Sequence, residues 1–441
     1  MRQRVEEKLN QYLILPIKLF MGREKSGGIV LLFSVALAMV LANTNLATSY
    51  FHFFEQKVGF IVNGEPYLNC SLHHWINDGL MAMFFFVVGL ELKREFIGGE
   101  LADIRNTILP IGAAIGGMIV PALIFLSLNI GTPQTMGWGI PMATDIAFAL
   151  GVVYLLGDKV PVSAKVFLTT LAIVDDLGAV LVIAFFYTSE LSIASLLFGL
   201  CFLAVMFIGN RLGIKSLFFY AALGIGGVWV TFLLSGIHAT IAAVLAAFMI
   251  PADAKINESV YLKRMKKLTR RFEKEEPNEV RTLEEGQVDV LTHIQHDTEI
   301  AIPLLQQLEH KMSPIVTFLI MPIFAIANAG ISFTDLSLSD IFSTHVALGV
   351  TLGLLLGKPI GIIGATFLMV KMRWATLPSA ITRRTLLGLG MLASIGFTMS
   401  MFISTLAFTD ELLMTQAKLG IFLASILGGI GGYVLLNKKS K

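Results

Sequence analysis

Residues 163–187 read SAKVFLTTLAIVDDLGAVLVIAFFY, an apolar run with two adjacent acids, Asp175 and Asp176, near its centre. A helix rises about 1.5 Å per residue, so a run of this length crosses the roughly 30 Å apolar core of a bilayer. One charged side chain at mid-membrane costs roughly 2.5–3.5 kcal/mol on insertion scales, and two cost on the order of 5–7 kcal/mol. Nothing structural in a lipid-facing helix needs such a pair. The run therefore predicts a membrane span that binds a cation, carries protons, or does both.

The composition of the whole chain is that of a polytopic helical membrane protein. Of its 441 residues 55% are hydrophobic and only 15% are charged, whereas soluble domains carry roughly 25% charged residues. The two cysteines, Cys70 and Cys201, form neither a disulfide framework nor a metal-ligand pattern. A net charge of +2 gives no indication of a nucleic-acid partner. The first 25 residues lead into a full-length apolar span, which predicts a retained signal-anchor.

Twelve apolar segments are candidate membrane spans. They lie at about 27–43, 75–92, 108–128, 138–156, 163–187, 193–209, 216–234, 236–250, 313–330, 344–370, 385–406 and 414–436. With these spans every Lys and Arg lies on one side of the membrane, except Lys57 and Lys418 on the other side and Lys358 inside a span. The positive-inside rule therefore predicts that both termini are cytoplasmic, and the even number of spans agrees.

Two polar connections are longer than turns. The outer segment, about 44–74, contains Asn63-Gly64 between β-formers, which indicates a β-hairpin that can pair with a partner, or equally an ordinary loop turn. The charged cytoplasmic insertion 252–312 separates spans 1–8 (residues 1–251) from spans 9–12 (residues 313–441) of one integral membrane domain. Its part from Lys263 to Glu276 is a basic-then-acidic helix former. This part either lies on the anionic leaflet or, as the favoured alternative, is a solvated helix joined to a mobile linker.

The other polar residues inside spans occur where the helices are weakened. Asp145 and Thr144 follow Pro141, and Lys358 precedes Pro359, which removes a backbone donor within a span. Span 11 contains Gly388, Gly390 and Gly396 but no ionisable group. A broken helix is tolerated at this depth only where it lines a cavity or packs within protein. Its half-helix N-termini carry partial positive charge, which a carboxylate such as Asp145 can offset.

Adjacent carboxylates in this setting suit a hard cation. Na⁺ and Li⁺ take oxygen ligands, by the logic that gives Ca²⁺ and Mg²⁺ carboxylates and carbonyls. Burial and like charge favour the protonated acids, so protons and a metal ion compete for the same oxygens. Neighbouring helix positions point about 100° apart, so Asp175 and Asp176 need not share one role. The structural alternative, a helix-packing hydrogen bond, explains a lone acid better than two adjacent acids, a third acid and a buried lysine.

These motifs resemble the signature of the bacterial NhaA-type Na⁺/H⁺ antiporters over nearly the whole chain and in the same order. The resemblance is carried by ATDIAFALG at 143–151, AIVDDLGA at 172–179, GIHAT at 236–240, GKP at 357–359 and SIGFTMS at 394–400. It implies an all-α fold of about 12 transmembrane helices, with spans 3–5 and 10–12 as inverted repeats and discontinuous helices 4 and 11 crossing at the midplane. It also implies a cytoplasmic funnel, location in the bacterial inner membrane, and export of Na⁺ or Li⁺ in exchange for more than one proton per ion, for sodium and pH homeostasis.

Carried over by position, the resemblance implies that Asp176 with Asp175 binds the cation and protons and that Thr144 is an accessory ligand. Asp145 balances the half-helix dipoles, and Lys358 pairs with Asp175 and can itself release a proton. Gly396 and Phe397 mark the unwound part of helix 11. The implied pH-sensing residues are Glu91, Arg94, Glu95, Glu309, His310 and His238, although for His238 alone a buried, hydrogen-bonded histidine is the first interpretation. The hairpin about Asn63-Gly64 corresponds to the family's homodimer contact. The implied partners are Na⁺, Li⁺, H⁺ and the lipid bilayer, with no cofactor.

The chain departs from the family pattern at two places. The stretch 252–306 is longer than the corresponding loop of the best-known members, and Ser313 stands where some members have a second histidine. The resemblance thus predicts activation at alkaline pH without placing its midpoint.

Three other classes of protein use intramembrane acids or ions in ways that differ from an antiporter. A sodium-coupled organic-solute symporter of related fold is the principal alternative. An intramembrane aspartyl protease needs its aspartates on two helices, and adjacent acids cannot clamp one peptide bond, so we do not expect an enzyme. A channel needs a continuous polar lining, and these spans are too apolar for one.

Overall fold

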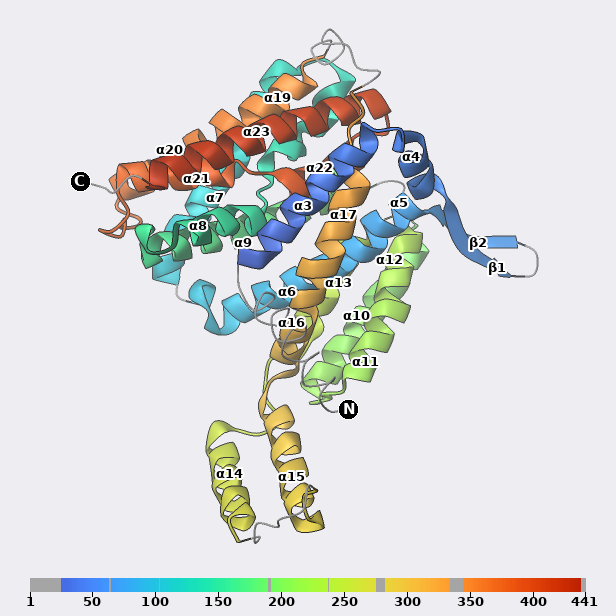
Figure 1. Cartoon of the computed structure of the whole chain (residues 1–441), viewed down its shortest axis with the longest axis vertical. Coiled ribbons are helices and arrows are strands. Elements are labelled where there is room, and N and C mark those ends of the chain that lie inside the picture. The colour runs from blue at the N-terminus through green and yellow to red at the C-terminus, as the bar shows by residue number, and fades with distance from the viewer. Residues whose placement is uncertain are drawn as a thin grey trace, which may run out of the picture.

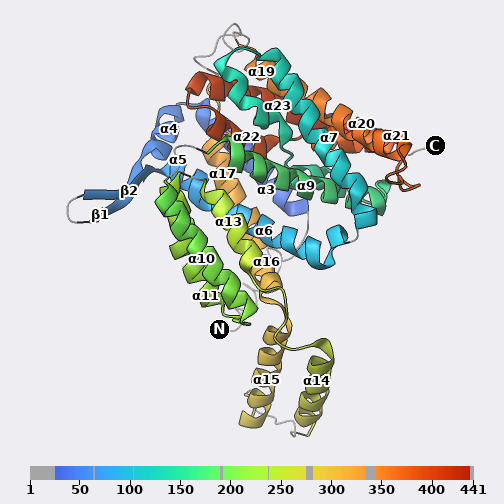
Figure 2. The ribbon, with the colours of Figure 1, turned by 180° about the vertical axis from the view of Figure 1, so that it is seen from behind.

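The computed structural model describes residues 25–62, 65–102, 104–188, 192–236, 238–274, 282–333 and 344–437. Within these ranges the protein is almost wholly helical, and its β-structure is one two-stranded antiparallel sheet. Figure 1 shows a body of long helices from which two pieces project, the strand pair β1–β2 and the helix pair α14–α15. The view from behind in Figure 2 shows the same two projections leaving different parts of the body.

The helices occupy the twelve predicted segments. Spans 1–6 are formed by α3 (Lys25–Ala42); α5, η2 and α6 (Leu72–His74, Trp75–Leu80 and Met81–Gly98); α7 (Ile104–Leu128); η4 and α8 (Pro133–Met142 and Ile146–Leu156); α9 (Val162–Phe186); and α10 (Ile193–Arg211). Spans 7–12 are formed by α11, η6 and α12 (Leu217–Ala221, Ala222–Trp229 and Val230–Ser235); α13 (Ala239–Met249); α16, η7 and α17 (Leu304–Ile315, Val316–Ile320 and Met321–Asn328); α19, η8 and α20 (Val346–Leu352, Gly353–Gly357 and Lys358–Lys371); α21 and α22 (Arg383–Ala393 and Phe397–Ala407); and α23 (Glu411–Asn437).

The lengths of these helices confirm an all-α polytopic membrane protein. In the described ranges nine helices are long and apolar enough to cross a bilayer, and two bent pairs raise the number to as many as eleven. The shorter apolar helix α13 lies at the predicted position of span 8. Span 9 begins at Leu304, nine residues before the predicted start, because α16 continues directly into η7 and α17.

Two spans are broken, and their breaks meet. Span 4 loses helical structure at residues 143–145, between η4 and α8, and span 11 loses it at residues 394–396, where α21 and α22 differ in direction by 45°. The Asp145 amide donates to the Ile395 carbonyl at 2.6 Å, and the Thr144 hydroxyl donates to the Ala393 carbonyl at 2.9 Å. Discontinuous helices 4 and 11 are therefore confirmed. The break in span 11 is narrower than predicted, because Phe397 is already the first residue of α22.

The helices of spans 3 and 10 come into direct backbone contact at one point. A Cβ atom on Gly361 of α20 would overlap the backbone carbonyl of Gly116 on α7. Small residues of this kind allow two helix backbones in a membrane to approach closely. The contact fixes α20, whose first residue is Lys358, against the α7–α9 group of helices.

The segment between spans 1 and 2 is a helix followed by a hairpin. Helix α4 (Ala47–Glu55) turns by 111° from α3, which the sequence did not predict. Strands β1 (Lys57–Val62) and β2 (Glu65–Ser71) then pair antiparallel, with Val62 opposite Glu65 and Lys57 opposite Ser71. This pairing confirms the hairpin over an ordinary loop, while Asn63 and Gly64 themselves lie outside the described residues. We call this end of the molecule the hairpin end.

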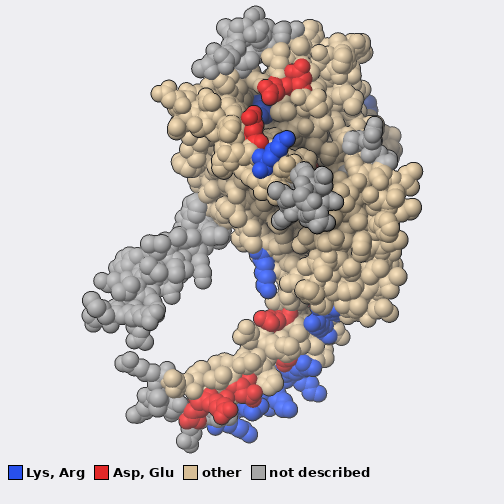
Figure 3. Space-filling model, turned by 90° about the vertical axis from the view of Figure 1, so that its right-hand side faces the viewer, with Lys and Arg blue, Asp and Glu red and all other residues tan. Residues whose placement is uncertain are grey.

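The charged insertion forms a projecting arm of two helices where the sequence predicted one. Helix α14 (Glu258–Phe272) packs on α15 (Glu285–Ala301) through ion pairs of Arg264 with Asp297 at 2.9 Å and of Arg271 with Asp289 at 3.1 Å. Figure 3 shows basic side chains along one side of this arm and acidic ones along the other. The arm points away from the spans, which favours the solvated interpretation over a helix lying on the leaflet. We call this end the arm end.

Candidate ion-binding site

The two aspartates lie in the middle of α9 and are both buried. Asp175 is 1% exposed and Asp176 is 3% exposed. Each has one carboxylate oxygen, Oδ1, that is buried and accepts no hydrogen bond from the described residues. An orphaned buried carboxylate oxygen is costly unless something positive binds it. The pair therefore offers two oxygens of the kind that a hard cation or a proton takes.

Asp175 faces a lysine from another span. The Lys358 ammonium donates to Asp175 Oδ2 and, at 2.7 Å, to the Thr144 hydroxyl. Lys358 is fully buried, at 0% exposure, in the first turn of α20. A buried ion pair of this kind is stable only while both partners are present. The structure thus brings together three of the predicted site residues, from spans 4, 5 and 10.

Asp145 lies where two half-helices begin. Its Oδ1 accepts from the Phe148 amide of α8 at 3.2 Å, and its Oδ2 accepts from the Thr398 amide of α22 at 3.0 Å. The Thr398 hydroxyl also donates to Oδ2. One carboxylate therefore caps the positive ends of both broken helices, which is the geometry expected for dipole compensation.

Asp176 points into a small cavity of about 160 Å³. The cavity is also lined by Asp145, Glu91, Ser313 and Thr398, from spans 4, 2, 9 and 11. Because Asp175 is held by Lys358 while Asp176 lines this space, the two adjacent acids have different surroundings, as the 100° helical offset predicts. A cavity of this size holds an ion and a few waters, since a water takes about 30 Å³ of liquid volume.

The family model described as Na⁺/H⁺ antiporter 1 matches residues 18–436. This chain belongs to that family. It is 49% identical over 430 residues to a protein of Syntrophotalea carbinolica named Na(+)/H(+) antiporter NhaA 2, covering 96% of this chain and 97% of that protein. It is 47% identical over 422 residues to Na(+)/H(+) antiporter NhaA of Wolinella succinogenes, covering 95% and 92% respectively. It is also 47% identical over 432 residues to Na(+)/H(+) antiporter NhaA of Helicobacter pylori strain J99, covering 98% and 97%.

Most residues predicted to sense pH by resemblance to the NhaA family cluster at the arm end of spans 2 and 9. Arg94 pairs with Glu95 at 3.0 Å and with Glu309 of α16 at 3.1 Å. Glu91 lies one turn before this pair and lines the cavity of Asp176. His310 is exposed and lies next to Glu309. A chain of ionisable groups thus leads from the arm end to the cavity that Asp176 lines.

His238 does not join this cluster. It precedes α13 at the hairpin end, and its Nε2 lies 2.7 Å from the carbonyl of Tyr187, just after α9. The geometry matches the first interpretation from sequence, a partly buried, hydrogen-bonded histidine that ties span 8 to span 5.

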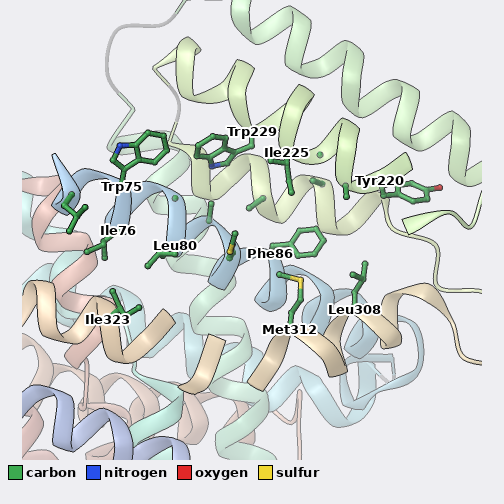
Figure 4. A pocket seen from close by; sticks show the side chains of 18 of the residues that line it. Trp75, Ile76, Leu80, Phe86, Tyr220, Ile225, Trp229, Leu308, Met312 and Ile323 are labelled. Atoms are coloured by element: carbon green, nitrogen blue, oxygen red, sulfur yellow. The ribbon is translucent and has the colours of Figure 1, made fainter. Parts of the chain in front are cut away.

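A second cavity, larger than that of the ion site, is apolar. It measures about 980 Å³ and lies between spans 2, 7, 8 and 9 (Figure 4). Trp75, Trp229, Phe86 and Met312 are among its lining side chains, and no acidic or basic residue of the described ranges lines it. A site for a bare cation needs oxygen ligands, so this apolar space does not suit one.

The sequence did not single out the hydroxyls that join the two broken helices. Thr398 binds Asp145, and the Ser400 hydroxyl donates to the Ile140 carbonyl at 2.8 Å. Both residues lie in the motif at 394–400, two and four residues after Gly396. A hydroxyl close to a helix-weakening glycine was the available signal. Only the fold brings Thr398 next to Asp145, which is 253 residues away in sequence.

Proposed function

We propose that this chain is an Na⁺/H⁺ antiporter that exchanges Na⁺ or Li⁺ for more than one proton per ion, with Asp176 and Asp175 as the shared binding site. The observation that supports this most directly is the pair of orphaned buried oxygens, Asp175 Oδ1 and Asp176 Oδ1, one acid lining a cavity and the other held by a lysine. Family membership and the names of the relatives agree with it. The transported ions are substrates, and we propose no cofactor and no enzymatic activity.

We propose that exchange arises from competition for the same oxygens. A cation entering the cavity binds Asp176 first, because that carboxylate lines the space. It also binds Asp175 through the unpartnered Oδ1, in competition with the Lys358 ammonium that holds Oδ2, with the Thr144 hydroxyl as an accessory ligand. Protons lost from the aspartates, or from Lys358 once its partner is taken, leave as the cation arrives. Asp145 stays bound to the two helix ends throughout, so its role is to offset their dipoles.

We propose that the charged groups at the arm end set the pH response. Arg94, Glu95 and Glu309 are held in one network between spans 2 and 9, and Glu91 connects it to the cavity. A change in charge there alters the entrance to the ion site. His310 neighbours this network, while His238 acts on spans 5 and 8 at the hairpin end.

We propose that the arm end is cytoplasmic and that the protein lies in the bacterial inner membrane. With the predicted spans, almost all Lys and Arg residues fall on the same side of the membrane as the 252–312 insertion, and the positive-inside rule makes that side cytoplasmic. In a cysteine-free background an impermeant thiol reagent should label Lys266→Cys on α14 in everted membranes only. Labelling in intact cells instead would reverse the orientation.

The ion-exchange proposal is tested with proteoliposomes that contain a pH-sensitive dye and receive Na⁺, Li⁺ and K⁺ in turn. Na⁺ and Li⁺ should each move protons in the opposite direction without any organic solute, and the larger K⁺ should not. Exchange should rise toward alkaline pH. A requirement for an organic solute would indicate the symporter instead, and an equal response from acidic to alkaline pH would reject the pH-sensing role.

We also propose that the protein is a homodimer joined through the β1–β2 hairpin. The Leu72 amide donates to the Gln56 carbonyl at 2.9 Å, so the chain ends at the base of the hairpin are already adjacent. Residues 57–71 can therefore be replaced by a short turn with little strain on the spans. Light scattering of the purified variant should then give a monomer where the parent gives a dimer, and a persisting dimer would contradict the proposal.

A further inference from the structure

A second group of polar side chains lies at the hairpin end of spans 2 and 9 and is not used by the ion site. His73 precedes η2, Asn77 lies within η2, and Asn328 ends α17. Asn77 and Asn328 are buried, whereas His73 is partly exposed. The turn of η2 is a π-helix, a widened form that occurs frequently at functional sites.

The three side chains form a closed ring of hydrogen bonds. His73 Nε2 lies 3.0 Å from Asn328 Oδ1, Asn328 Nδ2 donates to Asn77 Oδ1 at 2.9 Å, and Asn77 Nδ2 lies 3.2 Å from His73 Nδ1. Each member thus bonds to both of the others. The ring joins span 2 to span 9 at the end of the molecule opposite the Arg94–Glu309 pair, which joins the same two spans.

The bond pattern determines the protonation state of His73. Asn328 Nδ2 also donates to the Phe324 carbonyl at 3.0 Å, which fixes the orientation of that amide. Asn328 Oδ1 must then accept from His73 Nε2–H, and His73 Nδ1 must accept from Asn77 Nδ2. His73 is therefore the neutral imidazole, with its proton on Nε2.

A protonated His73 cannot complete the ring in any arrangement. Imidazolium has two donors and no acceptor, so both asparagines would have to turn their oxygens toward it. Their two amide nitrogens would then face each other, and both are donors. Flipping either amide only moves the donor–donor conflict to another side of the ring. A ring of one histidine and two primary amides closes only when the histidine is neutral.

We propose that His73 is a proton-binding site at the hairpin end, and that its protonation releases the outer end of span 2 from span 9. Protons can reach His73 without passing Asp175 and Asp176, because the His73 side chain is partly exposed at the end of the span. The charged and titratable groups that face it are Lys418 of α23 and the adjoining His74, which itself pairs with Asp78 at 3.2 Å. Acid on this side thus acts on the same two helices that hold the Arg94–Glu309 pair at the arm end. The release itself does not depend on the proposed exchange.

Amide hydrogen exchange measured by mass spectrometry on the whole purified protein tests this. Wild type and His73→Gln are compared at about pH 5 and about pH 8, which bracket the range in which imidazole titrates. Glutamine keeps one donor and one acceptor but cannot take the proton. Segments 72–80 and 321–330 should exchange several-fold faster in wild type than in His73→Gln at the acidic pH, and equally at the alkaline pH. His74→Gln removes the His74–Asp78 pair within segment 72–80 but leaves all three ring members in place, so its segment 321–330 should still exchange several-fold faster than in His73→Gln at the acidic pH.

Asn328→Asp is a second variant, for which we expect the opposite pH dependence of hydrogen exchange. A carboxylate has acceptors only, so it completes the ring with protonated His73 and leaves the neutral form one bond short. In this variant, exchange of segments 72–80 and 321–330 is compared with exchange of the same segments in His73→Gln at the same pH. The ratio should be lower at acidic than at alkaline pH. Equal exchange of wild type and His73→Gln at both pH values would overturn the proposal. So would an Asn328→Asp variant whose pH dependence has the wild-type sign.

Discussion

Replacing Asp176 by asparagine should abolish Na⁺-driven proton movement in proteoliposomes and leave the purified protein folded. Asparagine has nearly the same volume, so the packing of α9 is preserved. It cannot bind a proton at neutral pH, and it presents no negative charge to the cavity that Asp176 lines. The Asp176 Oδ1 atom has no hydrogen bond from the described residues to lose. Removing a charge that burial penalises should leave Tm equal or higher.

A matched control separates the site from general effects of removing an acid. Asp158→Asn changes an exposed residue in the turn after α8 (η5, Gly157–Lys159) and should exchange at the parent rate. Asp175→Asn should also lose exchange, because it removes the partner of Lys358 as well as an oxygen ligand. Wild-type exchange in Asp176→Asn would show that the cation binds elsewhere. Ion-driven proton flux and Tm, measured on the same preparations, distinguish loss of function from loss of fold.

The broken helices were predictable because their cause is local. Pro141 lacks a backbone donor, and Gly137, Gly139 and Gly396 weaken a helix by their own conformational freedom, whatever surrounds them. The spans and the hairpin follow from equally local patterns of hydropathy and turn residues. In the charged insertion the pattern indicated α14 but not α15, because α15 is polar and its ion pairs with α14 are contacts that the sequence does not show.

The contacts that give the site its chemistry are not local. Lys358 is 183 residues from Asp175 in sequence, and Asn328 is 255 residues from His73. Sequence alone shows that a buried lysine needs a carboxylate partner, and only resemblance to a family supplies which one. Nothing in the sequence indicates that Asp145 binds Thr398 or that His73 belongs to a ring, because a hydroxyl or an amide has many potential partners. These bonds appear only once the crossing of the helices is known.

Replacing Lys358 by methionine should both impair exchange and destabilise the protein. Methionine keeps most of the apolar volume but leaves Asp175 without its cation in a site where Lys358 and Asp175 are both buried. Removing one partner of a buried pair costs about 3–5 kcal/mol. Thermal unfolding in detergent should therefore give a clearly lower Tm, and Na⁺-driven proton flux should fall sharply. Lys371→Met, an exposed lysine at the end of the same helix, is the control for loss of a positive charge.

The double variant Lys358→Met with Asp175→Asn distinguishes a charge effect from a packing effect. If the loss in the single variant comes from an unpaired buried carboxylate, neutralising that carboxylate should restore most of the stability, so the two changes are strongly non-additive. Exchange should not return, because the double variant lacks both the carboxylate and the lysine. A double variant as unstable as the sum of its parts would mean that Lys358 acts through packing. Unchanged stability and exchange in Lys358→Met would reject a central role for the residue. Recovery of stability without recovery of transport is the result that would separate the structural role of this ion pair from its role in exchange.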